Sequence, residues 1–92
     1  MRFEWNPTKN RTNIRDHKID LADVPPFFSG PMLVELDDRE EYGEDRWVGI
    51  GFLRNIVIVV VFTEPRSDTI RIVSARKANR HERNRYEESL KN

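Results

Sequence analysis

The sequence predicts an α+β fold, in which a mainly antiparallel sheet packs against helices in two layers with the element order β-α-α-β-β-β-β-α. Residues 56–62 are apolar and almost entirely β-branched, which is typical of a central strand buried on both faces. Shorter strand-like segments, separated by turn residues, surround this run, and helix-capping residues occur near both ends of the chain. The length of 92 residues predicts one small domain over residues 1–92.

The first third of the chain is predicted to hold a short strand and two helices. Asn6 followed by Pro7 is typical of a helix N-cap and first helical position, so we expect a helix over residues 7–18 after the N-terminal strand. Pro25 and Pro26 stop a second helix, which begins after Asp20, within about one turn. Three residues spaced four apart share one face of the first helix: Lys9, Asn13 and His17.

The remainder is predicted to hold four strands and a final helix. Arg54 and Asn55 form a tight turn before the central strand, and residues 65–68 form another after it. Asn79 and Glu82 are spaced as in a capping box, which opens a helix that ends near residue 90. The predicted strands cover residues 32–36, 46–53, 56–62 and 69–75, and an acidic, mobile connection joins the first two.

Charge is balanced in total and segregated along the chain. The sequence has 16 basic and 16 acidic residues, of which residues 35–45 hold seven acids and one base, a net charge of −6. Residues 66–85 hold seven bases and two acids, a net charge of +5. We therefore predict separate acidic and basic surfaces, of which the basic one suits a polyanion.

Composition excludes several kinds of site. Because the chain has no cysteine, it can form no disulfide, thiolate nucleophile or cysteine-based metal site, and two histidines make a poor metal set. We expect no metal and no cofactor. The longest apolar run is far shorter than the roughly 18–20 residues that span a bilayer, and the N-terminus lacks the apolar region of a signal peptide. We therefore expect a cytoplasmic protein without membrane contact.

Candidate site residues lie at the strand ends. Arg76 and Lys77 come where a strand meets the last helix, and could bind an anion together with that helix N-terminus or pair with nearby acids. Arg46 and Glu64 could meet at one sheet edge, whereas Arg76 should lie at the far end of its strand from Glu64. A carboxylate beside arginines could accept a proton from a nucleophile, and a structural ion pair fits the spacing equally well. Tyr86 fits either core packing or hydrogen bonding to a phosphate.

Five short motifs in the same order resemble the BrnT-type toxins of type II toxin–antitoxin systems. They are Phe3-Glu4-Trp5-Asn6-Pro7-x-Lys9-x-x-x-Asn13, Gly43-Glu44-Asp45-Arg46-Trp47-x-x-Ile50-Gly51, Phe62-Thr63-Glu64, Ile70-Arg71-Ile72-Val73-Ser74-Ala75-Arg76-Lys77-Ala78 and Glu82-Arg83-x-x-Tyr86-Glu87. The chain departs from the family pattern at Asp16, where lysine is usual, at Lys18, where glycine is usual, and at Pro65, which separates Thr-Glu from Arg66.

The resemblance implies a RelE-like ribonuclease fold and a toxin that cleaves RNA to inhibit translation. It implies metal-independent cleavage, in which a ribose 2′-hydroxyl attacks the adjacent phosphate. It also implies neutralisation by a BrnA-like antitoxin that carries a ribbon-helix-helix DNA-binding region. Operator DNA would then be bound only through the antitoxin. The implied catalytic residues are Arg46, Glu64, Arg76 and Tyr86, with Glu64 as the proton acceptor and Arg46 and Arg76 stabilising the phosphate. The candidate substrate-binding residues are Lys9, His17, Arg71, Lys77, Arg80 and Arg83.

Two other kinds of protein compete with this reading. A non-enzymatic nucleic-acid-binding or corepressor module would grip phosphate in a salt-sensitive way and leave the nucleic acid intact. A scaffold partner would only complete the fold of another protein. On the toxin reading, the basic surface is also where an acidic segment of the antitoxin docks.

Overall fold

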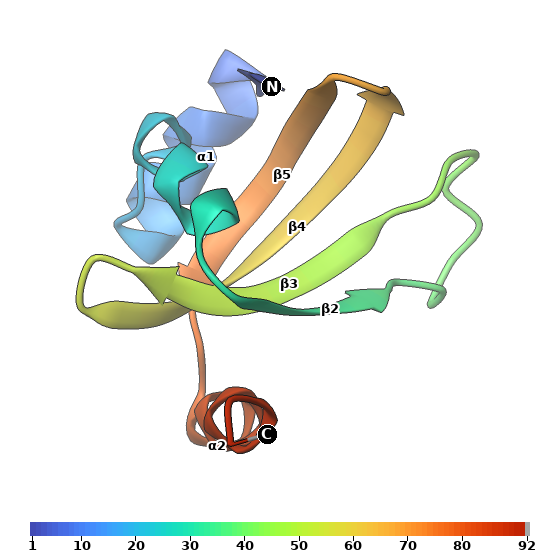
Figure 1. Cartoon of the computed structure of the whole chain (residues 1–92). Coiled ribbons are helices and arrows are strands. Elements are labelled where there is room, and N and C mark those ends of the chain that lie inside the picture. Colours follow the sequence, from blue (N-terminus) through green and yellow to red (C-terminus); the bar gives the residue numbers. More distant parts are fainter. Residues whose placement is uncertain (92) are drawn as a thin grey trace.

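The computed structural model describes residues 1–91 and confirms the α+β class, with a five-stranded sheet packed against helices (Figure 1). The strands lie in the order β1-β5-β4-β3-β2, in which β1 is parallel to β5 and all other neighbours are antiparallel. The elements in chain order are β1 (Arg2–Glu4), α1 (Pro7–His17), the 3-10 turns η1 (Leu21–Asp23) and η2 (Pro25–Ser29), β2 (Met32–Leu36), β3 (Trp47–Leu53), β4 (Ile56–Arg66), β5 (Thr69–Lys77) and α2 (Arg80–Ser89).

The predicted second helix is two 3-10 turns instead of one α-helix. Asp20 caps the first turn by accepting from the Ala22 N–H at 2.9 Å, as predicted. Pro25 then opens η2 and cannot donate to a continuing helix, so the chain turns again before Gly30. The short turns place Phe27 over β3, where a Cβ at Gly51 would lie 3.0 Å from its ring. The glycine is therefore required by this close approach.

The hairpin between β4 and β5 is longer than predicted. β4 continues through Pro65 to Arg66, and the turn is confined to residues 67 and 68. The register shifts between Thr63 and Arg66, which is a bulge that accommodates the proline without breaking a regular ladder. The prediction of a turn over residues 65–68 was therefore too wide.

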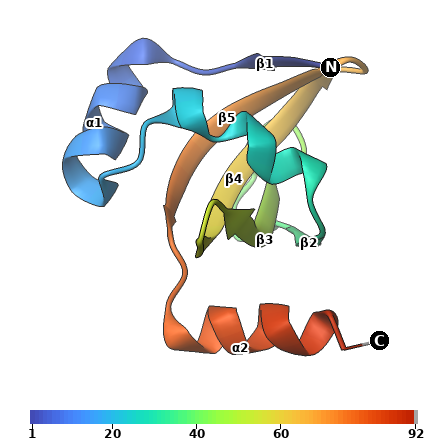
Figure 2. The same ribbon diagram turned by 60° about the vertical axis from the view of Figure 1, so that its left-hand side comes forward.

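Helices lie on both faces of the sheet, and they cover the two faces unequally (Figures 1 and 2). The α1, η1 and η2 segments cover one face, where Leu21 and Phe27 pack on Ile58 and Val60. On the other face, which we call the α2 face, α2 packs on one end of the sheet through Tyr86. The sheet residues in this second cluster are Ile50, Val57 and Val59. Part of the α2 face is thus left without a helix above it.

Asn13 attaches α1 to β5. Its side chain is buried, donates to the Ile19 carbonyl at 2.8 Å and to the Ala75 carbonyl at 3.0 Å, and accepts from the Ala75 N–H at 3.1 Å. Lys9 and His17, which share its helix face in the sequence pattern, are exposed on either side of it. One amide therefore holds the C-terminal half of α1 beside the C-terminal half of β5.

The predicted capping box of α2 is confirmed. The Asn79 side chain accepts from the Glu82 N–H, and the Glu82 carboxylate accepts from the Asn79 N–H, both at 2.8 Å.

No helix among residues 1–91 is both long enough and apolar enough to cross a membrane.

Replacing Lys18 with glycine is expected to stabilise the protein. Lys18 ends α1 in the left-handed region, at φ 61, where a side chain is disfavoured and where the sequence pattern of BrnT-type toxins has glycine. Lys18→Gly should raise the free energy of unfolding by roughly 1 kcal/mol, measured by urea denaturation. Lys18→Ala is the matched control, because it removes the Nζ contact to the Arg15 carbonyl and keeps the strained φ. Equal stability of the glycine and alanine variants would contradict the explanation.

Candidate active site

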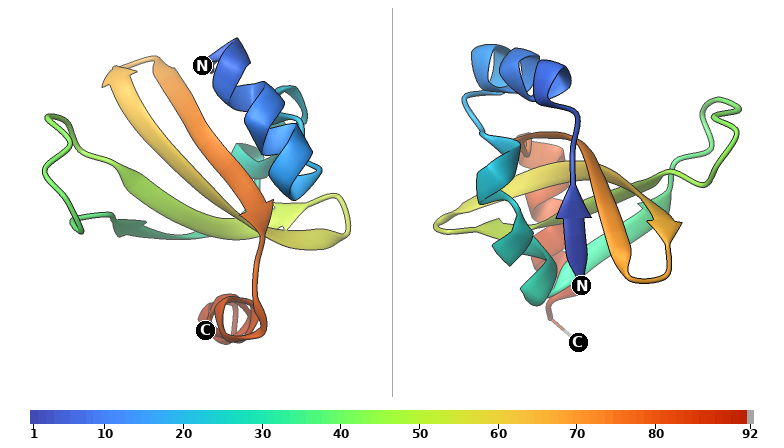
Figure 3. Two further views of the ribbon diagram at one scale, coloured as in Figure 1. Left: turned by 180° about the vertical axis from the view of Figure 1, so that it is seen from behind. Right: turned by 90° about the horizontal axis from the view of Figure 1, so that it is seen from above.

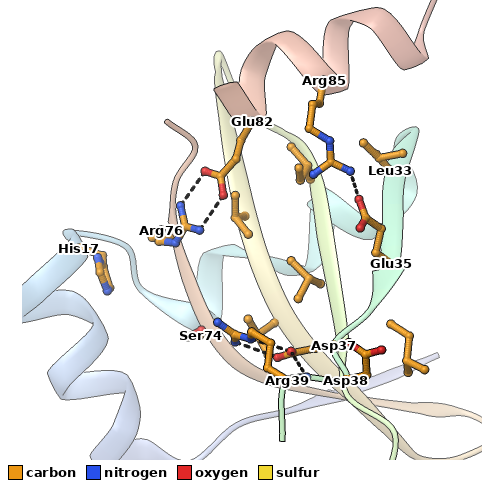
Figure 4. Close-up of a pocket in the computed structure, with 15 residues that line it drawn as sticks. His17, Leu33, Glu35, Asp37, Asp38, Arg39, Ser74, Arg76, Glu82 and Arg85 are labelled. Atoms are coloured by element: carbon orange, nitrogen blue, oxygen red, sulfur yellow. Dashed lines mark hydrogen bonds and ion pairs between the residues drawn. The ribbon is translucent and has the colours of Figure 1, made fainter. Parts of the chain in front are cut away.

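A cavity of about 540 Å³ opens on the α2 face, beside the part of the sheet that α2 covers (Figure 4). Its floor is apolar and its rim is charged. β3 and β4 supply the floor through Val48, Ile50, Val59 and Val61. The rim residues come from four parts of the chain and include His17, Glu35, Asp37, Arg39, Ser74, Arg76, Glu82 and Arg85. We call this the charged cavity.

Three arginine–carboxylate pairs form much of the rim of the charged cavity. Arg76 donates to both oxygens of Glu82 at 2.8 Å, and Arg39 donates to both oxygens of Asp37 at 2.7 and 2.9 Å. The third pair joins Arg85 on α2 to Glu35 on β2. The guanidinium groups of Arg76 and Arg39 are thereby each held in one orientation by two hydrogen bonds to a single carboxylate.

The position of Arg76 follows from the way β5 leads into α2. Glu82 is the capping-box residue of α2, and its carboxylate accepts from the Asn79 N–H as well as from Arg76. The Glu82 pair raises the pKa of Arg76, and the Arg76 hydrogen bonds lower the pKa of Glu82. The positive charge of Arg39 acts on Arg76 in the opposite direction, which indicates that the two guanidinium groups share one electrostatic environment.

His17 is the last residue of α1 and lies at the edge of the charged cavity (Figure 4). With Ser74 it also lines a smaller cavity of about 280 Å³ that contains Lys9. The Asn13 contacts to Ala75 fix this end of α1 against β5. No side chain among residues 1–91 forms a hydrogen bond with the His17 imidazole, so both ring nitrogens can serve a ligand.

The structure does not bring the predicted catalytic residues together. Among the predicted site residues, only His17 and Arg76 line the charged cavity. Glu64 lies on the opposite face of the sheet, in an apolar groove of about 790 Å³ that it shares with Phe3 and Phe28. Arg46 and Glu64 are at the same end of the sheet, as expected, but strand alternation turns them to opposite faces. Arg76 lies opposite Val59, far along β4 from Glu64, as expected.

Tyr86 is a core residue in this structure. It is fully buried, its ring packs edge-on against Phe52, and its hydroxyl donates to the Pro31 carbonyl at 2.9 Å. Burial raises the pKa of the phenol. The core-packing alternative therefore fits, and the hydroxyl is not directed at a bound phosphate.

The other predicted binding residues surround the charged cavity at a distance. Arg71 pairs with Glu4 at 2.7 Å, and Arg46 lies under the Tyr42 ring at 3.9 Å from its centroid. Lys77 and Arg80 are exposed, and Arg83 donates to the Ala78 carbonyl at 3.0 Å. Lys77, Arg80 and Arg83 form a basic margin around the end of β5 and the start of α2, whereas Arg46 and Arg71 lie towards the other end of the sheet.

Sequence reasoning missed two of the three guanidinium groups on the cavity rim, those of Arg39 and Arg85. Arg39 is the only base among seven acids in residues 35–45, and that exceptional position was a usable signal. The acidic segment is also not a simple mobile connection, because Asp37 is buried and accepts from Arg39 and from the Tyr42 hydroxyl. Beyond this cluster the segment projects past the end of the sheet (Figure 3).

The two charged segments meet instead of forming separate surfaces. Glu35 pairs with Arg85, and Glu44 lies 4.0 Å from Arg71. Both segments also line the charged cavity. The predicted separation of charge along the sequence was therefore wrong for the fold, because the β2–β3 and β5–α2 connections converge on the same face. Among residues 1–91, no group of three or more histidine and carboxylate side chains is arranged to hold a metal ion.

Acid is expected to loosen the segment around Asp37 before it unfolds the sheet. The Arg39 guanidinium lowers the pKa of Asp37 from 3.8 to about 2, so the ionised pair stabilises the folded state fully above the ordinary value. This contribution is lost as the pH falls from about 4 through about 2. Urea titrations of wild type and Asp37→Asn, followed by the fluorescence of the nearby Trp47, measure this contribution. Asp37→Asn should lose less stability than wild type over this pH interval. An equal loss in both proteins would contradict the assignment.

Comparison with known proteins agrees with the fold and the sequence motifs. Residues 5–82 match the family described as the ribonuclease toxin BrnT of type II toxin–antitoxin systems. The structure is similar to the crystal structure of the Brucella abortus ribonuclease toxin BrnT at 1.1 Å resolution, with a TM-score of 0.69 and 29% sequence identity. That match covers 87% of this chain and 99% of the Brucella chain. No curated protein sequence matches the chain. The chain belongs to the BrnT family of ribonuclease toxins from type II toxin–antitoxin systems, whose members are paired with an antitoxin.

Proposed function

We propose that this chain is an endoribonuclease that cleaves RNA in the charged cavity and thereby inhibits translation. The observation that carries the proposal is the presence of His17 and Arg76 on the rim of one cavity in a member of a ribonuclease toxin family. Histidine is the side chain that exchanges protons most readily near neutral pH, and guanidinium is suited to phosphate oxygens. The apolar floor favours desolvation of a bound nucleotide, which strengthens both interactions.

In the proposed reaction, the ribose 2′-oxygen attacks the adjacent phosphorus and gives up its proton to His17. The bond from phosphorus to the 5′-oxygen breaks, so the products are a 2′,3′-cyclic phosphate and an RNA fragment with a 5′-hydroxyl. The leaving 5′-oxygen takes up a proton from solvent, and Arg76 stabilises the additional negative charge on the pentavalent phosphorus. His17 takes the place of Glu64 as proton acceptor, because Glu64 lies on the other face of the sheet.

The antitoxin is proposed to be a BrnA-like protein with a ribbon-helix-helix region, through which the complex would bind operator DNA in the cytoplasm. An acidic segment of it would dock on the basic margin beside the charged cavity. Lys77 and Arg80 support this placement because both are exposed there. A complex whose interface leaves Arg71, Arg76, Arg80 and Arg83 free would contradict it.

The test uses the purified chain, free of antitoxin, with end-labelled RNA. We expect cleavage that continues in EDTA and yields 2′,3′-cyclic phosphate and 5′-hydroxyl ends. Parallel reactions with and without ribosomes show whether translation complexes are required. RNA that shifts in a gel in a salt-sensitive way but stays intact under all these conditions would favour a binding or corepressor module instead.

A further inference from the structure

Two buried side-chain polar atoms among the described residues lack a hydrogen-bond partner, and they belong to neighbouring strands. They are Arg46 Nε and Thr63 Oγ1. Trp47 lies opposite Phe62 in the β3–β4 pairing, so Arg46, one residue earlier, lies beside Thr63. Buried donors are nearly always paired, and an unpaired one costs stability. Two neighbouring unpaired donors therefore indicate a ligand that would accept a hydrogen bond from each.

The unpaired hydroxyl lies between two guanidinium side chains. On its other side Thr63 is opposite Arg71 of β5, so Thr63 lies between Arg71 and Arg46, the residue that immediately precedes β3. Val59 and Val61 of β4 line the charged cavity, and alternation turns Thr63 to the same face. Two cations and a neutral donor on one face form a site for an oxyanion.

A carboxylate already lies beside this row. Glu44 Oε1 is 4.0 Å from Arg71 Nη1, which is too long for a hydrogen bond and is a weak, partly solvated contact. Glu4 holds the Nε side of Arg71 at 2.7 Å, and Tyr42 stacks on Arg46. Glu4 and Tyr42 thus orient the two guanidinium groups, while the Glu44 carboxylate is poorly placed and can be replaced.

We infer that Arg46, Thr63 and Arg71 bind a second phosphate of the RNA, separate from the phosphate that is cleaved. This inference rests on the proposed function of the charged cavity. Thr63 is four residues from Val59, the partner of Arg76, so the two phosphate sites are about 13 Å apart along β4. Thr63 Oγ1 is buried in the unbound chain, so this binding requires a side chain above it to change rotamer.

The test measures binding of a short 2′-O-methyl RNA, which cannot be cleaved, to wild-type protein and three variants. Thr63→Val should weaken binding about tenfold, because it removes a donor to a charged oxygen without changing side-chain shape. Thr63→Ser keeps the hydroxyl and should restore binding. Glu44→Gln should tighten binding, because it removes the competing carboxylate.

Oligonucleotides with a single uncharged methylphosphonate linkage identify the phosphate concerned. Neutralising one particular linkage should weaken wild-type binding and abolish the difference between wild type and Thr63→Val. Thr63→Val should unfold in urea at the same or a higher concentration than wild type, since the hydroxyl has no partner in the unbound chain. This stability measurement separates a lost contact from a damaged fold.

Unchanged RNA affinity in Thr63→Val, or a loss of affinity that is the same whichever linkage is neutralised, would overturn the second phosphate site. A requirement for Thr63 in binding an acidic peptide but not RNA would do so as well. If wild-type protein cleaves RNA while the Thr63 variants bind it normally, only this inference fails. If wild type binds as described and never cleaves RNA, the proposed function fails instead.

Discussion

Alanine in place of His17 is expected to slow RNA cleavage by about 10²–10⁴-fold, the usual contribution of a positioned proton acceptor. His17 is exposed at the edge of the charged cavity and ends α1, so its removal should leave the fold intact. The rate is measured in single-turnover reactions at saturating RNA.

His81 provides the matched control for this experiment. It is the only other histidine in the sequence, and it lies on α2 outside the charged cavity, in a shallow depression with Asn84 and Glu88. His81→Ala should therefore cleave RNA at the wild-type rate. Equal losses in the two variants, or a wild-type cleavage rate in His17→Ala, would remove His17 from the reaction.

Alanine in place of Arg76 is expected to slow cleavage by about 10²–10³-fold through loss of charge stabilisation in the transition state. It should also destabilise the fold, because the largely buried Glu82 carboxylate loses two hydrogen bonds at 2.8 Å. That loss costs about 1–3 kcal/mol. Single-turnover cleavage and urea denaturation together measure the two effects.

Two further substitutions separate the effects of Arg76. Arg76→Lys keeps the charge and loses the planar fork, so it should recover part of the activity and less of the stability. Arg54→Ala, in the β3–β4 turn outside the cavity lining, removes an arginine whose one ion pair within residues 1–91 is a long 3.8 Å contact with Asp23. It should leave cleavage unchanged. Full activity in Arg76→Ala protein that is shown to be folded would contradict the proposed site.

Local sequence signals predicted the elements well where one residue type decides the outcome. The β-branched run of β4 and the capping box of α2 depend on local sterics and local hydrogen bonds, and both are confirmed. Pro65 misled the prediction of the β4 end because a bulge tolerates a proline that a regular ladder would exclude. A bulge leaves no comparable signal in a single sequence.

The site was harder to predict because it depends on which face a side chain takes. Glu64 and Arg46 are at one sheet end, but a one-residue difference in position turns them to opposite faces. Capping patterns identified Glu82 as a helix residue, whereas its second role as the partner of Arg76 depends on the angle at which α2 leaves β5. Such contacts can be predicted only when the strand register and the connections between elements are known.

The buried amide of Asn13 makes one side of the charged cavity more rigid than the other. Moving α1 away from β5 would break its two hydrogen bonds to Ala75, and would leave backbone groups unpaired in the core. The opposite side is built on the segment around Asp37, whose side-chain hydrogen bonds are made to Arg39 and Tyr42 within the same segment, beyond which the chain projects past the end of the sheet. We therefore expect adjustment to different RNA sequences on the Asp37 side, while His17 and Arg76 keep a fixed separation.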